Sequence, residues 1–222
     1  MHKIGVIIAM DKELELFSSS INNMQKEELH QRCYYQGKSH NKELTVVVSG
    51  IGKVNAAVCT SDLINHFHCD FIINIGISGG LDANLQIGDF VVGDDITYHD
   101  VWCWDENKYG QVPGMPECYH SAPEISALFK DLKHGLLCCG DKFIVTAEEL
   151  NQIKQLFPQA LAVDMESAAI AQTCYLHNIS FISIRQISDT PGIKHHAEQY
   201  EEFWKNAPQH SVSMLNRLLE KI

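Results

Sequence analysis

The sequence predicts an α/β fold of three layers, α/β/α, in which helices cover both faces of a central, mostly parallel mixed sheet. Two observations predict it. Short apolar runs of strand length alternate along the chain with longer stretches of helical character. These runs are apolar throughout, as strands buried on both faces are. Such folds bind ligands at the carboxyl ends of their strands, so a site is expected in the turns that follow them.

Composition indicates one globular domain, spanning residues 1–222, that binds neither nucleic acid nor membranes. The chain is 45% hydrophobic and 20% charged, with a formal net charge of −11. Nucleic acids and anionic membranes are polyanions, so an acidic surface disfavours both. No apolar run approaches the roughly 18–20 residues that span a bilayer. The eight cysteines include no C-x-x-C pair, so we expect reduced thiols and a cytoplasmic location.

The first half of the chain supplies four predicted strands and two helices. The opening apolar run ends in charged residues without a small-residue cleavage site, which indicates a buried strand rather than a signal peptide. Leu14 and Phe17 fall on one side of the helix that follows. A glycine-rich turn at 49–53 leads into the second helix. The predicted strands span 3–10, 31–37, 44–49 and 71–76, and the helices span 11–20 and 54–66.

The second half continues the alternation of strands and helices. Residues 102–116 have the glycine and proline content of a loop. The predicted strands span 88–98, 135–139, 161–163 and 180–187. The predicted helices span 123–132, 147–156, 165–177 and 195 to the end.

The stretch 161–172 carries the first candidate site. A short apolar run leads into Asp164, Met165 and Glu166, and small residues in a helical pattern follow. Carboxylates two positions apart cannot share a helix face, so one is expected to point away while the other turns into a cleft. The alternative is structural, because acidic side chains also stabilise the exposed N–H groups at the start of a helix.

Three further turns could serve either a ligand or the fold alone. Glycines within 76–80 would supply backbone amide donors to a ligand, or would form a tight turn. Phe143 could stack on a planar base or pack into the core. Asp189 could donate a proton from a cleft, or could form a structural ion pair with Arg185.

Several other chemistries find no support in the sequence. Gly52-Lys53 does not belong to a phosphate-binding loop, because Val54 stands where that motif has Ser or Thr. His99-Asp100 and His195-His196 lack a spaced third ligand, so no metal is expected. No Ser-His-Asp or Cys-His arrangement indicates covalent catalysis.

Seven segments together carry a family resemblance: Gly5–Met10 with Glu13, Ser49–Ala57, Asn74–Leu81, Tyr98–Asp100, Gly140–Ile144, Val163–Glu166 and Ile187–Asp189. In this order they resemble the bacterial 5′-methylthioadenosine/S-adenosylhomocysteine nucleosidases of the nucleoside phosphorylase superfamily. The resemblance implies a nucleoside phosphorylase-like fold, a homodimer, and no metal or organic cofactor. It also implies that the loop 101–116 lies at the dimer interface and helps to close the partner's pocket.

The resemblance assigns roles to individual residues. Glu13 matches the carboxylate that activates the attacking water, and Asp189 matches the acid that protonates N7 of adenine. Ser188 would help to position Asp189, and Glu166 would hold the ribose hydroxyls. Phe143 would stack on adenine, and Met10, Ile51 and Tyr200 would line the pocket for the 5′-thio group. The remaining expected substrate-binding residues are Ser78, Gly79, Ile144 and Met165.

The expected function is hydrolysis of the N-glycosidic bond of 5′-methylthioadenosine and S-adenosylhomocysteine, with release of adenine. Cleavage builds positive charge on the sugar and negative charge on the base, so it needs an acid at the base, an anion near the sugar and a positioned water. The alternatives are a nucleosidase for 5′-deoxyadenosine or aminodeoxyfutalosine, a phosphorolytic purine nucleoside phosphorylase, and a nucleoside-binding protein without activity. Phosphate is usually clamped by arginine, and Arg185 is the one arginine within a motif, so water is favoured as the nucleophile.

Overall fold

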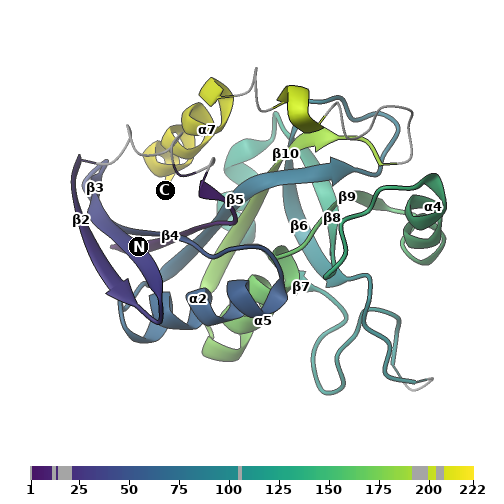
Figure 1. Ribbon diagram of the computed structural model, residues 1–222, viewed down its shortest axis with the longest axis horizontal. Coiled ribbons are helices and arrows are strands. Elements are labelled where there is room, and N and C mark those ends of the chain that lie inside the picture. The colour runs from purple at the N-terminus through teal and green to yellow at the C-terminus, as the bar shows by residue number, and fades with distance from the viewer. Residues whose placement is uncertain (1, 12–13, 15–21, 105–106, 192–199, 204–207) are drawn as a thin grey trace.

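The computed structural model describes residues 2–11, 14, 22–104, 107–191, 200–203 and 208–222, and its main feature is a large mixed sheet (Figure 1). The strands are β1 (Lys3–Ile8), β2 (Asn22–Leu29), β3 (Arg32–Ser39), β4 (Lys42–Val48), β5 (Phe71–Gly80), β6 (Phe90–Tyr98), β7 (Tyr119–His120), β8 (Lys133–Cys139), β9 (Ala160–Asp164) and β10 (Ser180–Asp189). The helices are α2 (Lys53–Asn65), α3 (Pro123–Ser126), α4 (Ala147–Leu156), α5 (Ser167–His177) and α7 (Pro208–Lys221), and a 3₁₀ turn follows α3 at Ala127–Phe129.

Part of the sheet closes on itself. The strand order is β10-β6-β8-β9-β5-β1-β4-β3-β2, β7 pairs with β6, and β10 also pairs with β5. Strands β5, β10, β6, β8 and β9 therefore form a closed ring, from which β1, β4, β3 and β2 extend as an open sheet. The plain three-layer description is corrected by this closure, because the middle layer is in part a barrel.

The sheet is also more evenly mixed than predicted. The pairs β1–β4, β1–β5, β5–β10, β6–β8 and β8–β9 are parallel, whereas β2–β3, β3–β4, β5–β9, β6–β7 and β6–β10 are antiparallel. The hairpins β2–β3 and β3–β4 turn at His30-Gln31 and His40-Asn41, where all four residues have positive φ. Paired positive φ values are the conformation of the two-residue turns that match strand twist.

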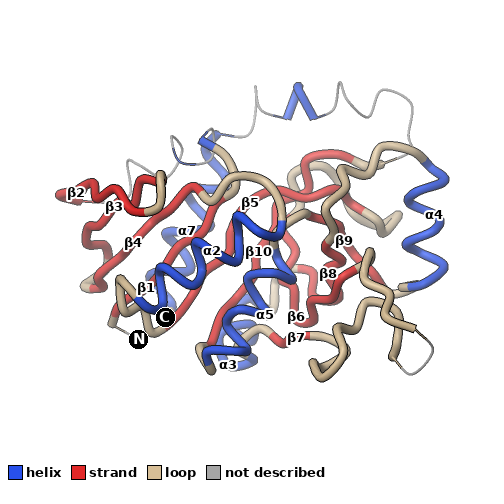
Figure 2. Tube along the Cα trace, turned by 60° about the horizontal axis from the view of Figure 1, so that its bottom comes forward, coloured by secondary structure: helices blue, strands red, loops and turns tan. Residues whose placement is uncertain are grey.

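Two hydrophobic clusters place helices on both faces of the sheet (Figure 2). Ala56, Cys59 and Leu63 of α2 pack with the small residues of α5 against one face. Leu215 and Leu218 of α7 pack with residues of α3 against the other. Helices therefore cover both faces of the sheet, as the sequence predicts, although part of the sheet between them is closed into a barrel. Among the described residues, no helix is long and apolar enough to cross a membrane.

Most predicted elements are present with small changes in their ends. The helix expected at 123–132 is shorter and finishes as the 3₁₀ turn. The strands β2 and β7 were not predicted. The tight turn considered for 76–80 is wrong, because those residues continue the strand β5. The helix expected at 11–20 and the beginning of the one expected from 195 lie outside the described residues, apart from Asp11 and Leu14, which are helical.

Candidate active site

A pocket opens where the carboxyl ends of several strands meet. Ala9 and Met10 follow β1, Ile51 follows β4, and Met165 and Glu166 follow β9. Tyr200 also lines the pocket, and the remaining lining residues come from the ends of β5, β9 and β10 and from the segments that follow β8 and β10. They are Ile77, Ser78, Gly79, Lys142, Phe143, Ile144, Val163, Asp164, Arg185, Ser188, Asp189 and Pro191.

The structure brings together every described residue that the sequence assigned to the site. These residues are Met10, Ile51, Ser78, Gly79, Phe143, Ile144, Met165, Glu166, Ser188, Asp189 and Tyr200. Glu13, the expected activator of water, lies outside the described residues. The role of each residue stays a prediction, whereas their convergence on one pocket is a structural fact.

Asp189 is buried at the end of β10 and held by its neighbour. The Ser188 hydroxyl lies 2.5 Å from Asp189 Oδ1 and 3.2 Å from the Ser78 carbonyl oxygen, both of which can accept its proton. Asp189 and Ser188 are each 1% exposed. A Cβ at Gly79 would lie 3.4 Å from Asp189 Oδ2 and 3.0 Å from Pro191. Glycine at 79 therefore lets the β5 backbone approach the acid closely.

Ser78 contributes an unpaired polar atom to the pocket wall. Ser78 is buried, and its Oγ has no hydrogen-bond partner among the described residues. Buried hydroxyls without partners are costly and uncommon in folded proteins. Ser78 is also one of the residues that line the pocket.

Glu166 is oriented by the turn that precedes α2. Its Oε1 accepts a hydrogen bond of 2.9 Å from the backbone N–H of Gly52. Gly52 has φ +98°, a conformation that glycine adopts without steric cost. The turn at 49–53 therefore serves the site as well as the start of α2, and it is not a phosphate-binding loop.

Asp164 forms a buried ion pair that the sequence reasoning missed. Arg185 Nε donates to Asp164 Oδ2 at 2.8 Å, and a terminal nitrogen of the same guanidinium group donates to Asn74 Oδ1 at 2.7 Å. Asp164 Oδ1 accepts from the N–H groups of Glu166 and Ser167, which begin α5. Burial acts to raise the pKa of Asp164, but Arg185 and the Ser167 amide outweigh it and leave that pKa below its ordinary value.

These contacts correct two expectations. The structural alternative for Asp189 was an ion pair with Arg185. The carboxylate with which Arg185 forms its buried ion pair is that of Asp164. Neither carboxylate of the 164–166 stretch points away, because both Asp164 and Glu166 are buried and both line the pocket. The two side chains point in different directions because Asp164 binds Arg185, whereas Glu166 binds the backbone N–H of Gly52.

Phe143 stands at the mouth of the pocket and does not pack into the core. Its side chain is 47% exposed, and its ring meets that of Tyr200 edge-on at a centroid distance of 5.7 Å. The Tyr200 hydroxyl lies 3.5 Å from the Met10 sulfur. Three side chains from distant segments thus surround one end of the pocket.

The segment that carries Phe143 is anchored by a charged cluster. Lys53 Nζ lies 2.9 Å from both carboxylate oxygens of Asp100 and 3.5 Å from Asp141 Oδ2. Asp141 also accepts from the Lys53 N–H and donates its own N–H to Asp100. Gly140 packs against the buried ring of His99, since a Cβ there would lie 2.4 Å from His99 Nε2. The cluster joins the starts of α2 and of the 141–144 segment.

One group of potential metal ligands occurs among the described residues, away from the pocket. Ligand atoms of Asp95, Cys118 and His120 lie within 4.8 Å of one another at the edge formed by β6 and the residues around β7. His120 Nδ1 is already 2.7 Å from Asp95 Oδ1, within hydrogen-bond distance. None of the three lines the pocket.

Comparison with known proteins gives a consistent result. The phosphorylase superfamily model matches residues 3–222. A 5′-methylthioadenosine/S-adenosylhomocysteine nucleosidase from Staphylococcus saprophyticus is 40% identical over 99% of this chain and 100% of its own length. The S-adenosylhomocysteine nucleosidase structure from Streptococcus pyogenes, in complex with 5-methylthiotubericidin, has a TM-score of 0.94, 36% identity, and coverage of 100% of this chain and 97% of that one. The corresponding enzyme of Neisseria meningitidis, in complex with methylthio-immucillin-A, has a TM-score of 0.91, 33% identity and full coverage of both chains.

Proposed function

Because this chain belongs to the phosphorylase superfamily and, within it, to the 5′-methylthioadenosine/S-adenosylhomocysteine nucleosidases, we infer that it hydrolyses the N-glycosidic bond of both nucleosides and releases adenine. It is an N-glycosyl hydrolase. The observation that carries this conclusion in the chain itself is the meeting of Asp189 and Glu166, which come from the ends of two different strands, around one pocket.

The chemistry divides between the two ends of the pocket. Asp189 acts as the acid that protonates N7 of adenine, with the Ser188 hydroxyl holding its carboxyl group. When the proton passes to N7, Asp189 becomes a carboxylate, whose Oδ1 accepts the hydrogen bond of the Ser188 hydroxyl. Phe143 stacks on the adenine, and the backbone of Ile144 contacts its edge.

Glu166 acts on the sugar. Its carboxylate, oriented by the Gly52 amide, binds the ribose hydroxyls. As the bond breaks the sugar becomes cationic, so an anion already fixed beside it stabilises the transition state more than the ground state. Glu13 activates the water that attacks the sugar, a role that rests on the family resemblance. Met10, Ile51 and Tyr200 form the apolar surroundings of the 5′-thio group.

An adenine-release assay tests the proposed function. The purified chain is given 5′-methylthioadenosine, S-adenosylhomocysteine, 5′-deoxyadenosine, aminodeoxyfutalosine and inosine in phosphate-free buffer. We expect release from the two thio-substituted nucleosides without added phosphate. Dependence on phosphate, with formation of a ribose 1-phosphate, would establish phosphorolysis instead. Stoichiometric binding without adenine release would establish a binding protein.

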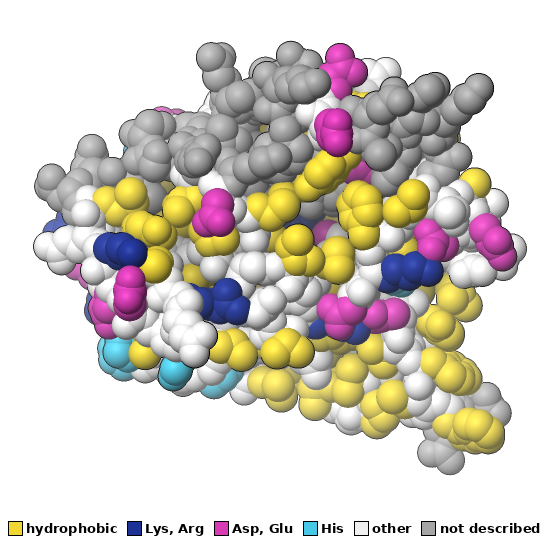
Figure 3. Space-filling model, viewed as in Figure 1, with side chains coloured by type: hydrophobic (Ala, Val, Ile, Leu, Met, Phe, Trp, Pro, Cys, Tyr) yellow, Lys and Arg dark blue, Asp and Glu magenta, His cyan; other side chains and the backbone are white. Residues whose placement is uncertain are grey.

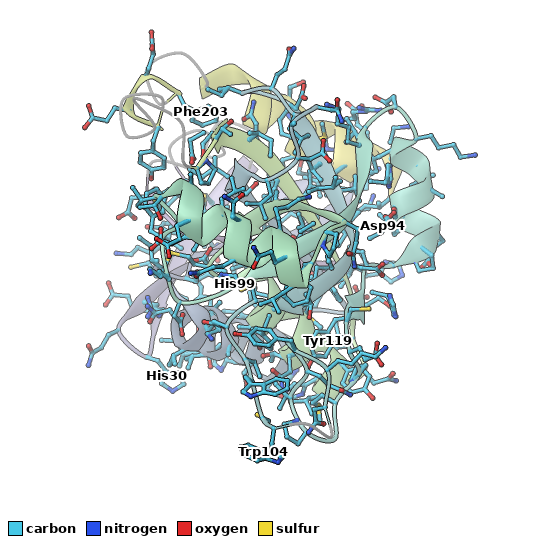
Figure 4. The ribbon with its side chains drawn as sticks, turned by 90° about the vertical axis from the view of Figure 1, so that its right-hand side faces the viewer. His30, Asp94, His99, Trp104, Tyr119 and Phe203 are labelled. Carbon is cyan, nitrogen blue, oxygen red and sulfur yellow. The ribbon has the colours of Figure 1, made fainter. Side chains whose placement is uncertain are left out.

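The partner of this chain is a second copy of itself, with the loop 101–116 at the interface. Exposed apolar side chains occur together on α2, on α5 and on this loop, and Figure 3 shows apolar atoms gathered below these helices and along the protruding loop. They are Val54, Val58, Trp102, Trp104, Tyr109, Tyr175 and Leu176. Trp104 stands at the outer end of the loop (Figure 4), where it can reach another molecule. Patches of this kind usually mark interfaces.

Two further expectations remain proposals. The family model spans nearly the whole chain, which supports one domain over residues 1–222. All eight cysteines are free thiols, and five of them are buried. Free thiols suit a reducing compartment, so we place the enzyme in the cytoplasm.

A further inference from the structure

A second hollow adjoins the nucleoside pocket and shares part of its wall. Ala9, Met10 and Ile51 line both spaces. Beyond Ile51 the second hollow is lined by polar and charged side chains, among them Asp11, Arg32 and Asn55. A substituent that leaves the 5′ end of the nucleoside pocket past Met10 and Ile51 would enter this hollow.

Arg32 is fixed at the wall of the second hollow. One of its terminal nitrogens donates to Asn55 Oδ1, and Asn55 Nδ2 donates to the Ile51 carbonyl oxygen at 2.7 Å. The other terminal nitrogen lies against Gly50, where a Cβ would be 3.4 Å away. The guanidinium is therefore held directly behind the Gly50–Ile51 turn that separates the two spaces.

The charge of Arg32 is the one arginine charge without a carboxylate partner among the described residues. The chain has three arginines, Arg32, Arg185 and Arg217. Arg185 pairs with Asp164, and Arg217 pairs with Asp131. Arg32 is held instead by the neutral amide of Asn55. A planar guanidinium with unused donors is the group best suited to bind a carboxylate from outside the chain.

We propose that this hollow binds the amino-acid end of the homocysteine substituent of S-adenosylhomocysteine, with Arg32 pairing with its carboxylate and Asp11 accepting from its ammonium group. The inference rests on the proposed function, because it assumes that the nucleoside occupies the neighbouring pocket. It makes Arg32 and Asp11 determinants of which 5′ substituent is preferred.

The chemistry of the two substrates explains why such a subsite matters. 5′-Methylthioadenosine ends at an uncharged methyl group, which the apolar side chains of Met10 and Ile51 can accommodate. The homocysteine substituent continues three carbons beyond the sulfur and ends in a carboxylate and an ammonium. The chain carries a net charge of −11, so a carboxylate approaching it is repelled unless a fixed cation stands at that place.

A substrate series separates the two charges of the substituent. The substrates are 5′-methylthioadenosine, S-adenosylhomocysteine, the 3-aminopropylthio nucleoside, which lacks the carboxylate, and the 3-carboxypropylthio nucleoside, which lacks the amine. For Arg32→Ala we expect kcat/KM to fall about tenfold, through KM, for the two substrates that carry a carboxylate. The methylthio and aminopropylthio nucleosides should be unaffected. Asp11→Asn should show the complementary pattern, with losses for the two substrates that carry an amine.

The controls distinguish recognition from a structural role. Arg217→Ala removes an arginine on α7 that does not line either space, so kcat/KM should stay unchanged for all four substrates. Arg32→Lys should restore part of the loss for the carboxylate substrates, because it keeps the charge without the planar fork. If Arg32→Ala lowered kcat/KM equally for all four substrates, the proposal would be overturned. An unchanged kcat/KM for S-adenosylhomocysteine would overturn it as well.

A binding measurement keeps this inference separable from the proposed function. Calorimetric titration of Asp189→Asn and of Asp189→Asn with Arg32→Ala should show weaker binding of S-adenosylhomocysteine, and not of 5′-methylthioadenosine, in the double variant. If the wild-type chain released no adenine, the proposed function would be wrong, and this titration alone would decide whether the subsite exists. Equal affinities of the two variants for S-adenosylhomocysteine would refute the subsite.

Discussion

Asp189 is the residue on which the proposed chemistry depends most directly. It is buried beside Ser188 and faces the pocket from the end of β10. We expect Asp189→Asn to lower kcat for adenine release by about 10²–10⁴-fold, because an amide cannot donate the proton that the departing base requires. Initial rates with 5′-methylthioadenosine measure this loss.

The fold should survive this change, since asparagine has nearly the same shape. Circular dichroism and the thermal midpoint of Asp189→Asn should match those of the wild type. Ser188→Ala serves as a graded companion, because it removes the hydroxyl that holds Asp189 but leaves the acid in place. Near-normal turnover in Asp189→Asn would show that Asp189 is not the proton donor.

Asp164 is expected to matter for stability rather than as a proton donor. Asp164→Asn can keep its oxygen on the α5 amides, but it would then turn an N–H toward Arg185 and leave a buried cation unpaired. We expect a loss of about 3–5 kcal/mol in the free energy of unfolding at pH 7. Urea midpoints of the two proteins measure it.

The same pair fixes the sign of a pH dependence. The folded pKa of Asp164 lies below its ordinary value of 3.8, so its stabilising effect is fully present above pH 3.8. That effect is lost as the pH falls from there through the folded pKa. The difference in unfolding free energy between wild type and Asp164→Asn should therefore be constant from pH 5 to 8 and shrink below about pH 3.8. A difference that grew on acidification would contradict the assigned ion pair.

Residue positions in the site were predictable where a motif fixed them to the end of a strand. Ser78, Glu166 and Asp189 all follow or end apolar runs. The parallel pair β5–β10 brings Ser78 beside Asp189. Glu166 reaches them through the antiparallel pair β5–β9. The partners of these residues were not predictable. Arg185 lies four residues from Asp189 and 21 from Asp164, yet it pairs with Asp164. The twist and closure of the strands decide that choice, and neither is visible in sequence spacing.

At the scale of elements, the segment 141–144 depends on its anchor to α2. Lys53→Met would leave the carboxylates of Asp100 and Asp141 side by side without the ammonium that joins them. The resulting repulsion should loosen the segment that carries Phe143. We expect KM for 5′-methylthioadenosine to rise roughly five- to tenfold with a smaller change in kcat, because Asp189 lies on another element.

Lys133→Met is the matched control for this element. Lys133 pairs with Asp89 at 2.8 Å, a similar partly exposed ion pair at the opposite end of β8. Partly exposed pairs contribute about 0–1 kcal/mol, so both variants should melt close to the wild type. Only Lys53→Met should change KM. A similar KM in both variants would show that the anchor does not position the segment.

The elements that the sequence missed have a common physical cause. The strand β2, read Asn-Asn-Met-Gln-Lys-Glu-Glu-Leu, contains almost no apolar residues. It pairs with β3 alone at the edge of the sheet, where polar and charged side chains are usual. The strand β7 has only two residues. Periodicity detects burial, so it cannot find strands that are exposed or very short.

At the scale of the whole molecule, the site survives an error in the predicted architecture. The sequence did not predict the closed ring, because its closure requires β10 to pair with both β5 and β6. Apolar runs record that a strand is buried but not which strand lies beside it. The ring nevertheless gathers the ends of β5, β8, β9 and β10 at one pocket, which is where the sequence placed the candidate site.

The dimer is the last expectation that belongs to this scale. Val54 is 76% exposed on α2, next to the pocket residue Ile51 but outside the pocket itself. Sedimentation of the wild type should give a mass near twice 25.0 kDa. Val54→Glu should place an unpaired charge in the interface and give a monomer with reduced adenine release, because the partner's loop no longer closes the 5′ end. Leu128→Glu, at an exposed apolar residue in the 3₁₀ turn, should remain a dimer with normal activity. A wild type that was active and strictly monomeric would show that one chain completes its own pocket.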